Sequence, residues 1–126
     1  MDKIVVTSNK APKAIGPYSV AIRAGMFVFT SGQLGLDPQS GDLVPGGVEA
    51  ETRQALTNIR NVLEASGSSL EAVVKTTVFL KDMVEFSKMN AVYAEFFPEN
   101  PPARSTIQAA LPKGGCVEIE TIALVK

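Results

Sequence analysis

The chain has 126 residues, of which 45% are hydrophobic and 20% charged, a composition that fits one globular domain over residues 1–126 with disorder expected at most at the termini. A net charge of −1 argues against a nucleic-acid partner, and no apolar run reaches the roughly 18 residues that a membrane span needs. The absence of histidine excludes Ser-His-Asp and Cys-His catalysis within one chain. We therefore expect a cytoplasmic protein, with an organelle left open, whose acids and bases are carboxylates, lysines, tyrosines, a thiol or water.

The first half of the chain predicts three strands followed by a helix. Short β-prone apolar runs occur at 4–7, 20–23 and 26–31. Ala24-Gly25 separates the second run from the third at a spacing typical of a tight hairpin. Pro and Gly residues make 37–47 an irregular connection. Apolar residues then recur at helical spacing from Val48 to Leu63, and Gly67 is a good helix stop.

The second half predicts a strand, a helix and two more strands. The β-branched run Val73 to Leu80 indicates an inner strand. Asp82, with Glu85 three residues later, indicates a capped helix whose apolar stripe ends before Pro98 and whose default role is core packing. Strands are expected at 105–110 and 116–125, joined as a hairpin by the turn at 112–115. The order is βββαβαββ, an α+β fold.

This order also predicts an assembly. Two amphipathic helices can cover one face of a mixed sheet, yet the strands at 26–31, 73–80 and 117–125 carry apolar side chains on both faces. Apolar patches of that size are rarely left to water. We therefore expect a homo-oligomer in which sheets meet across subunits.

Arg104 and Glu118 are the candidate functional residues. Arg104 lies between the stiff Pro101-Pro102 turn and a strand, where a guanidinium can hold a planar carboxylate by two parallel hydrogen bonds. Glu118 and Glu120 share one strand face and can raise each other's pKa. The predicted hairpin brings Arg104 and Glu118 into one neighbourhood. A surface arginine and a solvated strand end remain the simpler alternatives.

The sequence holds no signature of a metal or nucleotide site. The lone Cys116 cannot form a cysteine-rich metal site, and its simplest role is that of a small buried residue. The acidic residues are too scattered for a calcium loop, and Gly114-Gly115 lacks the surroundings of a phosphate loop. We expect neither a metal nor a nucleotide cofactor.

Six segments in order along the chain resemble the RidA/YjgF family, the reactive intermediate deaminases. They are Ile15-Gly16-Pro17-Tyr18-Ser19, Thr30-Ser31-Gly32-Gln33, Val74-Lys75-Thr76-Thr77-Val78, Asn90-Ala91-Val92-Tyr93, Pro102-Ala103-Arg104-Ser105 and Glu118-Ile119-Glu120. The resemblance implies a chorismate-mutase-like fold, homotrimers and active sites in the clefts between subunits. It also implies hydrolysis of 2-imino acids, and of the enamines in equilibrium with them, to 2-oxo acids and ammonia. Such imines leak from pyridoxal-phosphate dehydratases, and the deaminase itself carries no cofactor.

The resemblance also assigns roles to individual residues. Arg104 would clamp the substrate carboxylate, and Glu118 would position and polarise the attacking water together with the backbone carbonyl of Thr106. Tyr18, Ser31, Gly32 and Asn90 would line the cleft, and Phe86 would supply an apolar wall. Many members have cysteine where this chain has Thr106. A threonine has no thiol, so thiol chemistry at this position is ruled out in this chain. The segment between Phe97 and Arg104 is shorter than in some relatives, which leaves substrate size open.

Two other classes stay open at this point. One is a trimeric module that binds small 2-oxo acids without turnover, which the presence of Glu118 beside Arg104 argues against. The other is an RNA-cleaving translation inhibitor, an activity attributed to some relatives. The lack of histidine and of a basic stripe argues against that class.

Overall fold

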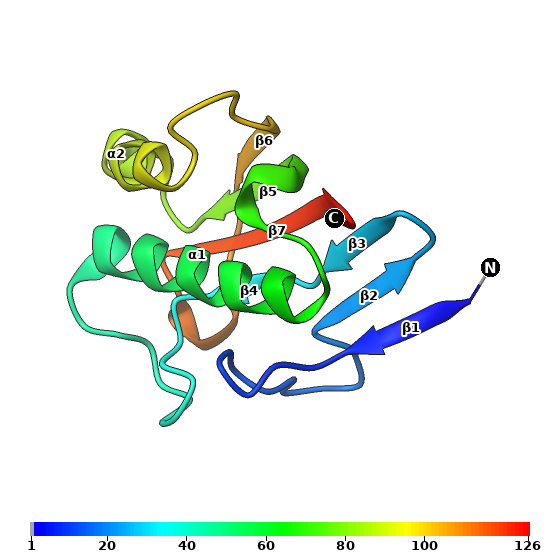
Figure 1. The fold of residues 1–126 in the computed structure, drawn as a ribbon. Helices are drawn as coiled ribbons and strands as arrows, with labels where there is room; N and C mark the ends of the chain where they lie inside the picture. The colour runs from blue at the N-terminus through cyan, green and yellow to red at the C-terminus, as the bar shows by residue number, and fades with distance from the viewer. Residues whose placement is uncertain (1) are drawn as a thin grey trace.

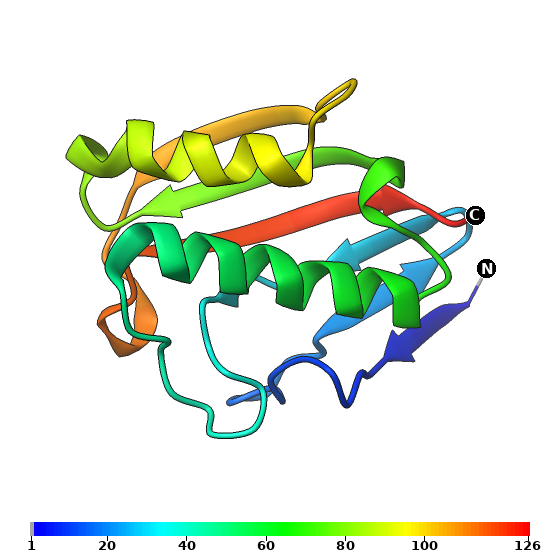
Figure 2. The same cartoon turned by 60° about the vertical axis from the view of Figure 1, so that its left-hand side comes forward.

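The computed structural model describes residues 2–126, whose strands form one mixed sheet with two helices packed on one face (Figures 1 and 2). The strands are β1 (Lys3–Val6), β2 (Ala21–Ala24), β3 (Phe27–Thr30), β4 (Gln33–Leu34), β5 (Val73–Leu80), β6 (Ala103–Gln108) and β7 (Val117–Leu124). The helices are α1 (Gly47–Ala65) and α2 (Phe86–Phe96), with short 3-10 turns η1 (Leu70–Ala72), η2 (Met83–Glu85) and η3 (Pro112–Gly114). The predicted α+β fold and element order are confirmed, with the two-residue β4 as an addition.

Helix α1 forms the main contact between the helical layer and the sheet. Its apolar positions at helical spacing, among them Leu56, Ile59 and Leu63, are fully buried. The helix ends as the sequence predicts, because Gly67 has a φ of +80°, a conformation that glycine adopts without steric cost. The amide of Ser68 then donates to the carbonyl of Leu63 at 2.9 Å.

Helix α2 begins later than the sequence suggests. The side chain of Asp82 accepts a hydrogen bond from the amide of Val84 at 3.0 Å, so it caps the turn η2 rather than the helix itself. The α-helix starts at Phe86 and buries Met89, Val92 and Tyr93. The predicted stripe is therefore a core stripe, as its spacing indicates.

The predicted hairpin between 105–110 and 116–125 is wrong. The sheet order is β1-β2-β3-β7-β5-β6, with β4 also paired to β7, so β7 lies between β3 and β5 (Figure 2). Strand β6 instead pairs with β5 in parallel, after the crossover through α2. The segment 112–115 contains a 3-10 turn, and the chain crosses there from one side of β5 to the other.

The sheet has one covered and one uncovered face. Val28, Val78 and Ile119 are fully buried in the hydrophobic core cluster. On the other face, Phe29 and Ile107 remain 43% and 48% exposed. Apolar side chains on the uncovered face thus have no cover within one chain. Among residues 2–126, no helix is both long and apolar enough to cross a membrane.

A buried asparagine attaches β4 to α1. Asn58 is fully buried, and its amide donates to the carbonyls of Leu34 at 3.3 Å and Leu36 at 3.0 Å. We expect Asn58→Ala to lower the free energy of unfolding by about 2–3 kcal/mol, because two carbonyls lose their buried donor. Chemical denaturation at fixed protein concentration measures this loss.

The matched control is Asn61→Ala, one turn further along α1. The Asn61 amide makes one exposed bond, to the carbonyl of Lys10, so its loss should cost less than about 1 kcal/mol. Equal losses in the two variants would contradict the role assigned to Asn58.

Candidate active site

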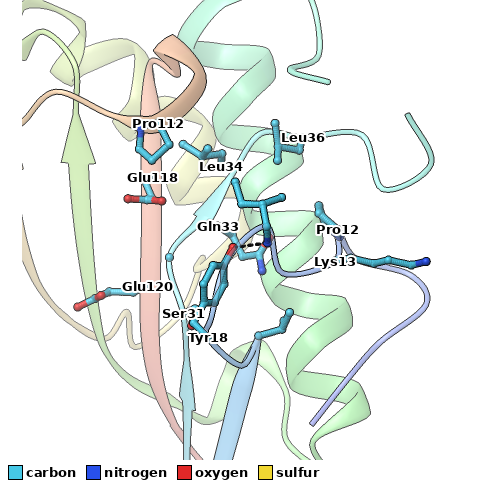
Figure 3. A pocket seen from close by; sticks show the side chains of 13 residues that line it. Pro12, Lys13, Tyr18, Ser31, Gln33, Leu34, Leu36, Pro112, Glu118 and Glu120 are labelled. Atoms are coloured by element: carbon cyan, nitrogen blue, oxygen red, sulfur yellow. Dashed lines mark hydrogen bonds between the residues drawn. The ribbon is translucent and has the colours of Figure 1, made fainter. Parts of the chain in front are cut away.

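Glu118 lies in a hollow of about 430 Å³ beside β4 and β7 (Figure 3). Three further residues expected in the site, Tyr18, Ser31 and Gly32, line the same hollow. Ile15, Leu36 and Pro112 add apolar wall, and Glu120 supplies a second carboxylate. The hollow therefore combines carboxylates, hydroxyl groups and an apolar wall.

Gly32 and Glu118 fit closely together. Strand β7 pairs with β4 on one side and β5 on the other, with Leu34 and Phe79 opposite Glu118. A Cβ atom at position 32 would come within 2.8 Å of the Glu118 Cδ, which is closer than real Cβ contacts allow. Glycine at position 32 therefore leaves the room that the carboxyl group occupies, beyond its predicted role at a strand end.

The pKa of Glu118 is raised above its ordinary value. The larger cause is burial, which disfavours the charged form, and the second is repulsion from the carboxylate of Glu120. A raised carboxyl pKa brings proton exchange closer to neutral pH. Glu118 is thus suited to accept and return a proton.

Tyr18 and Ser31 shape the hollow through local hydrogen bonds. The Tyr18 hydroxyl accepts from the amide of Ile15 at 3.2 Å, and the ring remains 46% exposed. The Ser31 hydroxyl donates to the carbonyl of Ser19 at 2.6 Å. Because that proton is already engaged, Ser31 offers a ligand its oxygen as an acceptor.

Arg104 lies in a second hollow, of about 380 Å³, beside α2. Its guanidinium carbon is 4.8 Å from the centre of the Tyr93 ring and 5.5 Å from that of Phe86, both within cation–π range. No carboxylate of residues 2–126 forms a salt bridge with it. The guanidinium is therefore stacked on aromatic rings and has no ion-pair partner there, so its charge is available to an anion.

Asn90 and Thr106 accompany Arg104. Asn90 lines the same hollow, and its Oδ1 is buried with no hydrogen-bond partner among residues 2–126. Thr106 lies two residues after Arg104 on β6, opposite Val78 of β5. A buried amide oxygen without a donor is uncommon and marks a place where another polar group fits.

The predicted site residues therefore form two groups on opposite faces of the sheet. Arg104 pairs with Thr76 and Thr76 with Thr121, which places all three side chains on the helix face. Glu118 is three residues from Thr121 on β7 and so points to the other face. The expectation that a hairpin brings Arg104 and Glu118 together is wrong, because β5 separates their strands.

Sequence reasoning missed some residues of both hollows. Tyr93 stacks on Arg104, although its place in the apolar stripe of α2 indicated only core packing. Its spacing of seven residues from Phe86 puts both rings on one helix face, which is a signal that the sequence contains. Pro112 is predicted as part of a hairpin turn, and its position at the rim of the Glu118 hollow depends on the strand order.

Cys116 has a structural setting. It is partly buried, and its amide donates to the carboxylate of Glu51 on α1 at 2.8 Å. Burial, and then Glu51, raise the pKa of the Cys116 thiol, which disfavours the reactive thiolate. Within residues 2–126 no three His, Cys, Asp or Glu side chains are placed to hold a metal ion.

Comparison with known proteins places this chain among close relatives. A family model described as endoribonuclease L-PSP matches residues 8–125. A RutC family protein of Pyrococcus horikoshii is 52% identical over 124 residues, or 98% of each chain. The 2-iminobutanoate/2-iminopropanoate deaminase of Bos taurus is 54% identical over 121 residues, covering 95% of this chain and 88% of the relative. The crystal structure of E. coli TdcF with bound serine has a TM-score of 0.92 at 38% identity and covers 98% of this chain and 99% of its own.

The raised pKa of Glu118 can be measured directly. In an NMR titration of the side-chain carboxyl carbons, we expect Glu118 to titrate above the ordinary value of 4.5. Glu120→Gln should bring the pKa of Glu118 only part of the way down, because burial is the larger cause. A wild-type pKa at or below 4.5 would remove Glu118 as a proton-transfer group.

The same shift sets the sign of a stability effect. The folded protein favours the protonated form of Glu118. The contribution of Glu118 to the free energy of unfolding is therefore fully present below its ordinary pKa and is lost as pH rises through its raised pKa. Glu118→Gln should therefore unfold at a higher denaturant concentration than wild type at neutral pH. The difference should shrink toward zero well below pH 4.5.

Proposed function

Because this chain belongs to the RidA/YjgF family described by the endoribonuclease L-PSP model, we propose that it is a 2-iminobutanoate/2-iminopropanoate deaminase. The proposal is supported by relatives of that name whose sequences are 49–54% identical to this chain over 121 residues. The observation that carries it is the Arg104 guanidinium, stacked on two rings and without a carboxylate partner in residues 2–126. A small 2-imino acid brings the planar carboxylate that this group lacks.

We further propose that the active site is completed between subunits of a homotrimer. Arg104 lies on β6, an edge strand of the sheet, whereas Glu118 lies on β7 and faces the opposite side. The uncovered face also carries exposed apolar side chains, which a neighbouring subunit would bury. In a closed ring, Arg104 of one subunit meets the Glu118 hollow of the next, and each interface forms one site.

Arg104 and Asn90 would bind and orient the substrate. Two parallel hydrogen bonds from the guanidinium hold the carboxylate, so that the C=N carbon faces the hollow of the neighbouring Glu118. The unpaired Asn90 Oδ1 is available to a donor of the substrate or of the neighbouring chain. Holding the substrate in this way places its C=N carbon next to the attacking water, so the two no longer have to meet by diffusion.

Glu118 would transfer the protons of the hydrolysis. As a water oxygen bonds to the iminium carbon, the Glu118 carboxylate takes one water proton, which gives a tetrahedral aminoalcohol. The protonated Glu118 returns that proton to the nitrogen, the C–N bond breaks and ammonia leaves. Loss of the hydroxyl proton gives the 2-oxo acid, and the overall products are the 2-oxo acid and ammonium. The backbone carbonyl of Thr106 would orient the water, a role that needs no thiol.

Removal of Arg104 tests the proposed role of the clamp. Arg104→Ala should lower kcat/KM for ammonia release from 2-iminobutanoate, formed in situ by a threonine dehydratase, by about 10- to 150-fold. The kcat/KM of Arg104→Lys should lie between those of wild type and Arg104→Ala, because a lysine keeps the charge but cannot make two parallel hydrogen bonds. Unchanged kcat/KM in Arg104→Ala would remove Arg104 from the mechanism.

The serine bound to the relative TdcF favours one alternative, a module that binds small carboxylates without turnover. Calorimetry on the wild-type protein separates the two functions. Binding of 2-oxobutanoate without faster loss of the imine would support the module. Cleavage of RNA is disfavoured by the lack of histidine and the net charge of −1.

A further inference from the structure

We propose that Tyr93, which the sequence identifies only as a core residue, is a positioning residue that fixes the Arg104 guanidinium for carboxylate binding. This inference rests on the proposed role of Arg104. Tyr93 lines the hollow of Arg104 but is only 5% exposed, and its ring face contacts the Arg104 guanidinium, so we assign its role to the placement of Arg104.

Arg104 needs external support to hold one orientation. It lies on an edge strand, and its long side chain has many rotamers. No salt bridge within residues 2–126 restrains the guanidinium. Its guanidinium instead lies against the ring faces of Tyr93, at 4.8 Å, and Phe86, at 5.5 Å.

Tyr93 is itself held from two further directions. Its hydroxyl shares a buried hydrogen bond of 2.7 Å with the Thr76 hydroxyl. Thr76 is the residue that pairs with Arg104 between β5 and β6. The Phe97 ring packs on Tyr93 with the ring centres 4.7 Å apart. The ring is thus fixed relative to the backbone that carries Arg104.

This arrangement predicts an effect on binding rather than on chemistry. A pre-oriented guanidinium loses less freedom when the carboxylate arrives, which strengthens binding. The carboxylate is held in the bound substrate as well as in the transition state, so loss of the ring should raise KM and leave kcat nearly unchanged. A purely structural role for Tyr93 would lower the amount of folded protein without shifting KM.

The test compares Tyr93→Leu with Tyr93→Phe. Tyr93→Leu removes the ring and should raise KM for 2-iminobutanoate, and Kd for 2-oxobutanoate measured by calorimetry, by about 5- to 30-fold. Tyr93→Phe keeps the ring face and should stay within about twofold of wild type in both constants. If Tyr93→Leu does not fold, Tyr93→Met takes its place, since methionine fills irregular space well.

Met89→Ala is the control for lost core packing. Met89 is fully buried one helical turn before Tyr93 on α2. Both Met89→Ala and Tyr93→Leu should lower the unfolding midpoint, but only Tyr93→Leu should raise KM and Kd. Circular dichroism confirms that each variant is folded at the assay temperature.

Two results would overturn the inference. One is a Kd for Tyr93→Leu within about twofold of wild type, and the other is an equal rise of Kd in Met89→Ala. Because calorimetry with 2-oxobutanoate needs no turnover, a wild-type protein that binds but does not hydrolyse imines would refute the proposed function alone. The Kd values would still decide the role of Tyr93.

Discussion

The alternation of side chains across a strand is the constraint on which the site depends. Register through β6, β5 and β7 places Arg104 on the helix face and Glu118 on the opposite face. The strands that carry them are two strand spacings apart, about 10 Å, with β5 between. No side-chain rotation within one chain can turn both groups toward one small substrate. The uncovered apolar face and the separation of Arg104 from Glu118 thus both support the proposed assembly, in which a neighbouring subunit covers the face and completes the site.

The two halves of the proposed site are held in different ways. Glu118 belongs to a strand paired on both sides, and Gly32 leaves a space that its carboxyl group fills. Arg104 belongs to an edge strand, and its guanidinium is held by ring faces rather than by ion pairs. The acid is thus placed by the backbone, whereas the cation is placed by side chains of α2. An edge position also leaves Arg104 accessible to a neighbouring chain.

Local features were predictable from the sequence, but strand order was not. The run Val73–Leu80 has the predicted bounds because β-branched residues favour an inner strand, and Gly67 ends α1 because only glycine adopts its φ without strain. The turn 112–115 has hairpin composition but carries the chain across β5, since β7 finds its partners in β3, β4 and β5. The sequence therefore identified residues that line two hollows but placed Arg104 and Glu118 in one neighbourhood, because their separation depends on long-range strand pairing that local patterns do not encode.

The most direct test of a site shared between subunits mixes two impaired variants. Arg104→Ala and Glu118→Gln subunits should each keep only a small part of the wild-type activity when alone. Co-assembled in equal amounts into trimers, they should reach about a quarter of wild-type ammonia release. The gain arises because about one interface in four combines an intact Arg104 of one subunit with an intact Glu118 of the next. If both residues served a site within one chain, the mixed trimers would be no more active than the separate variants, and an active site shared between subunits would be contradicted.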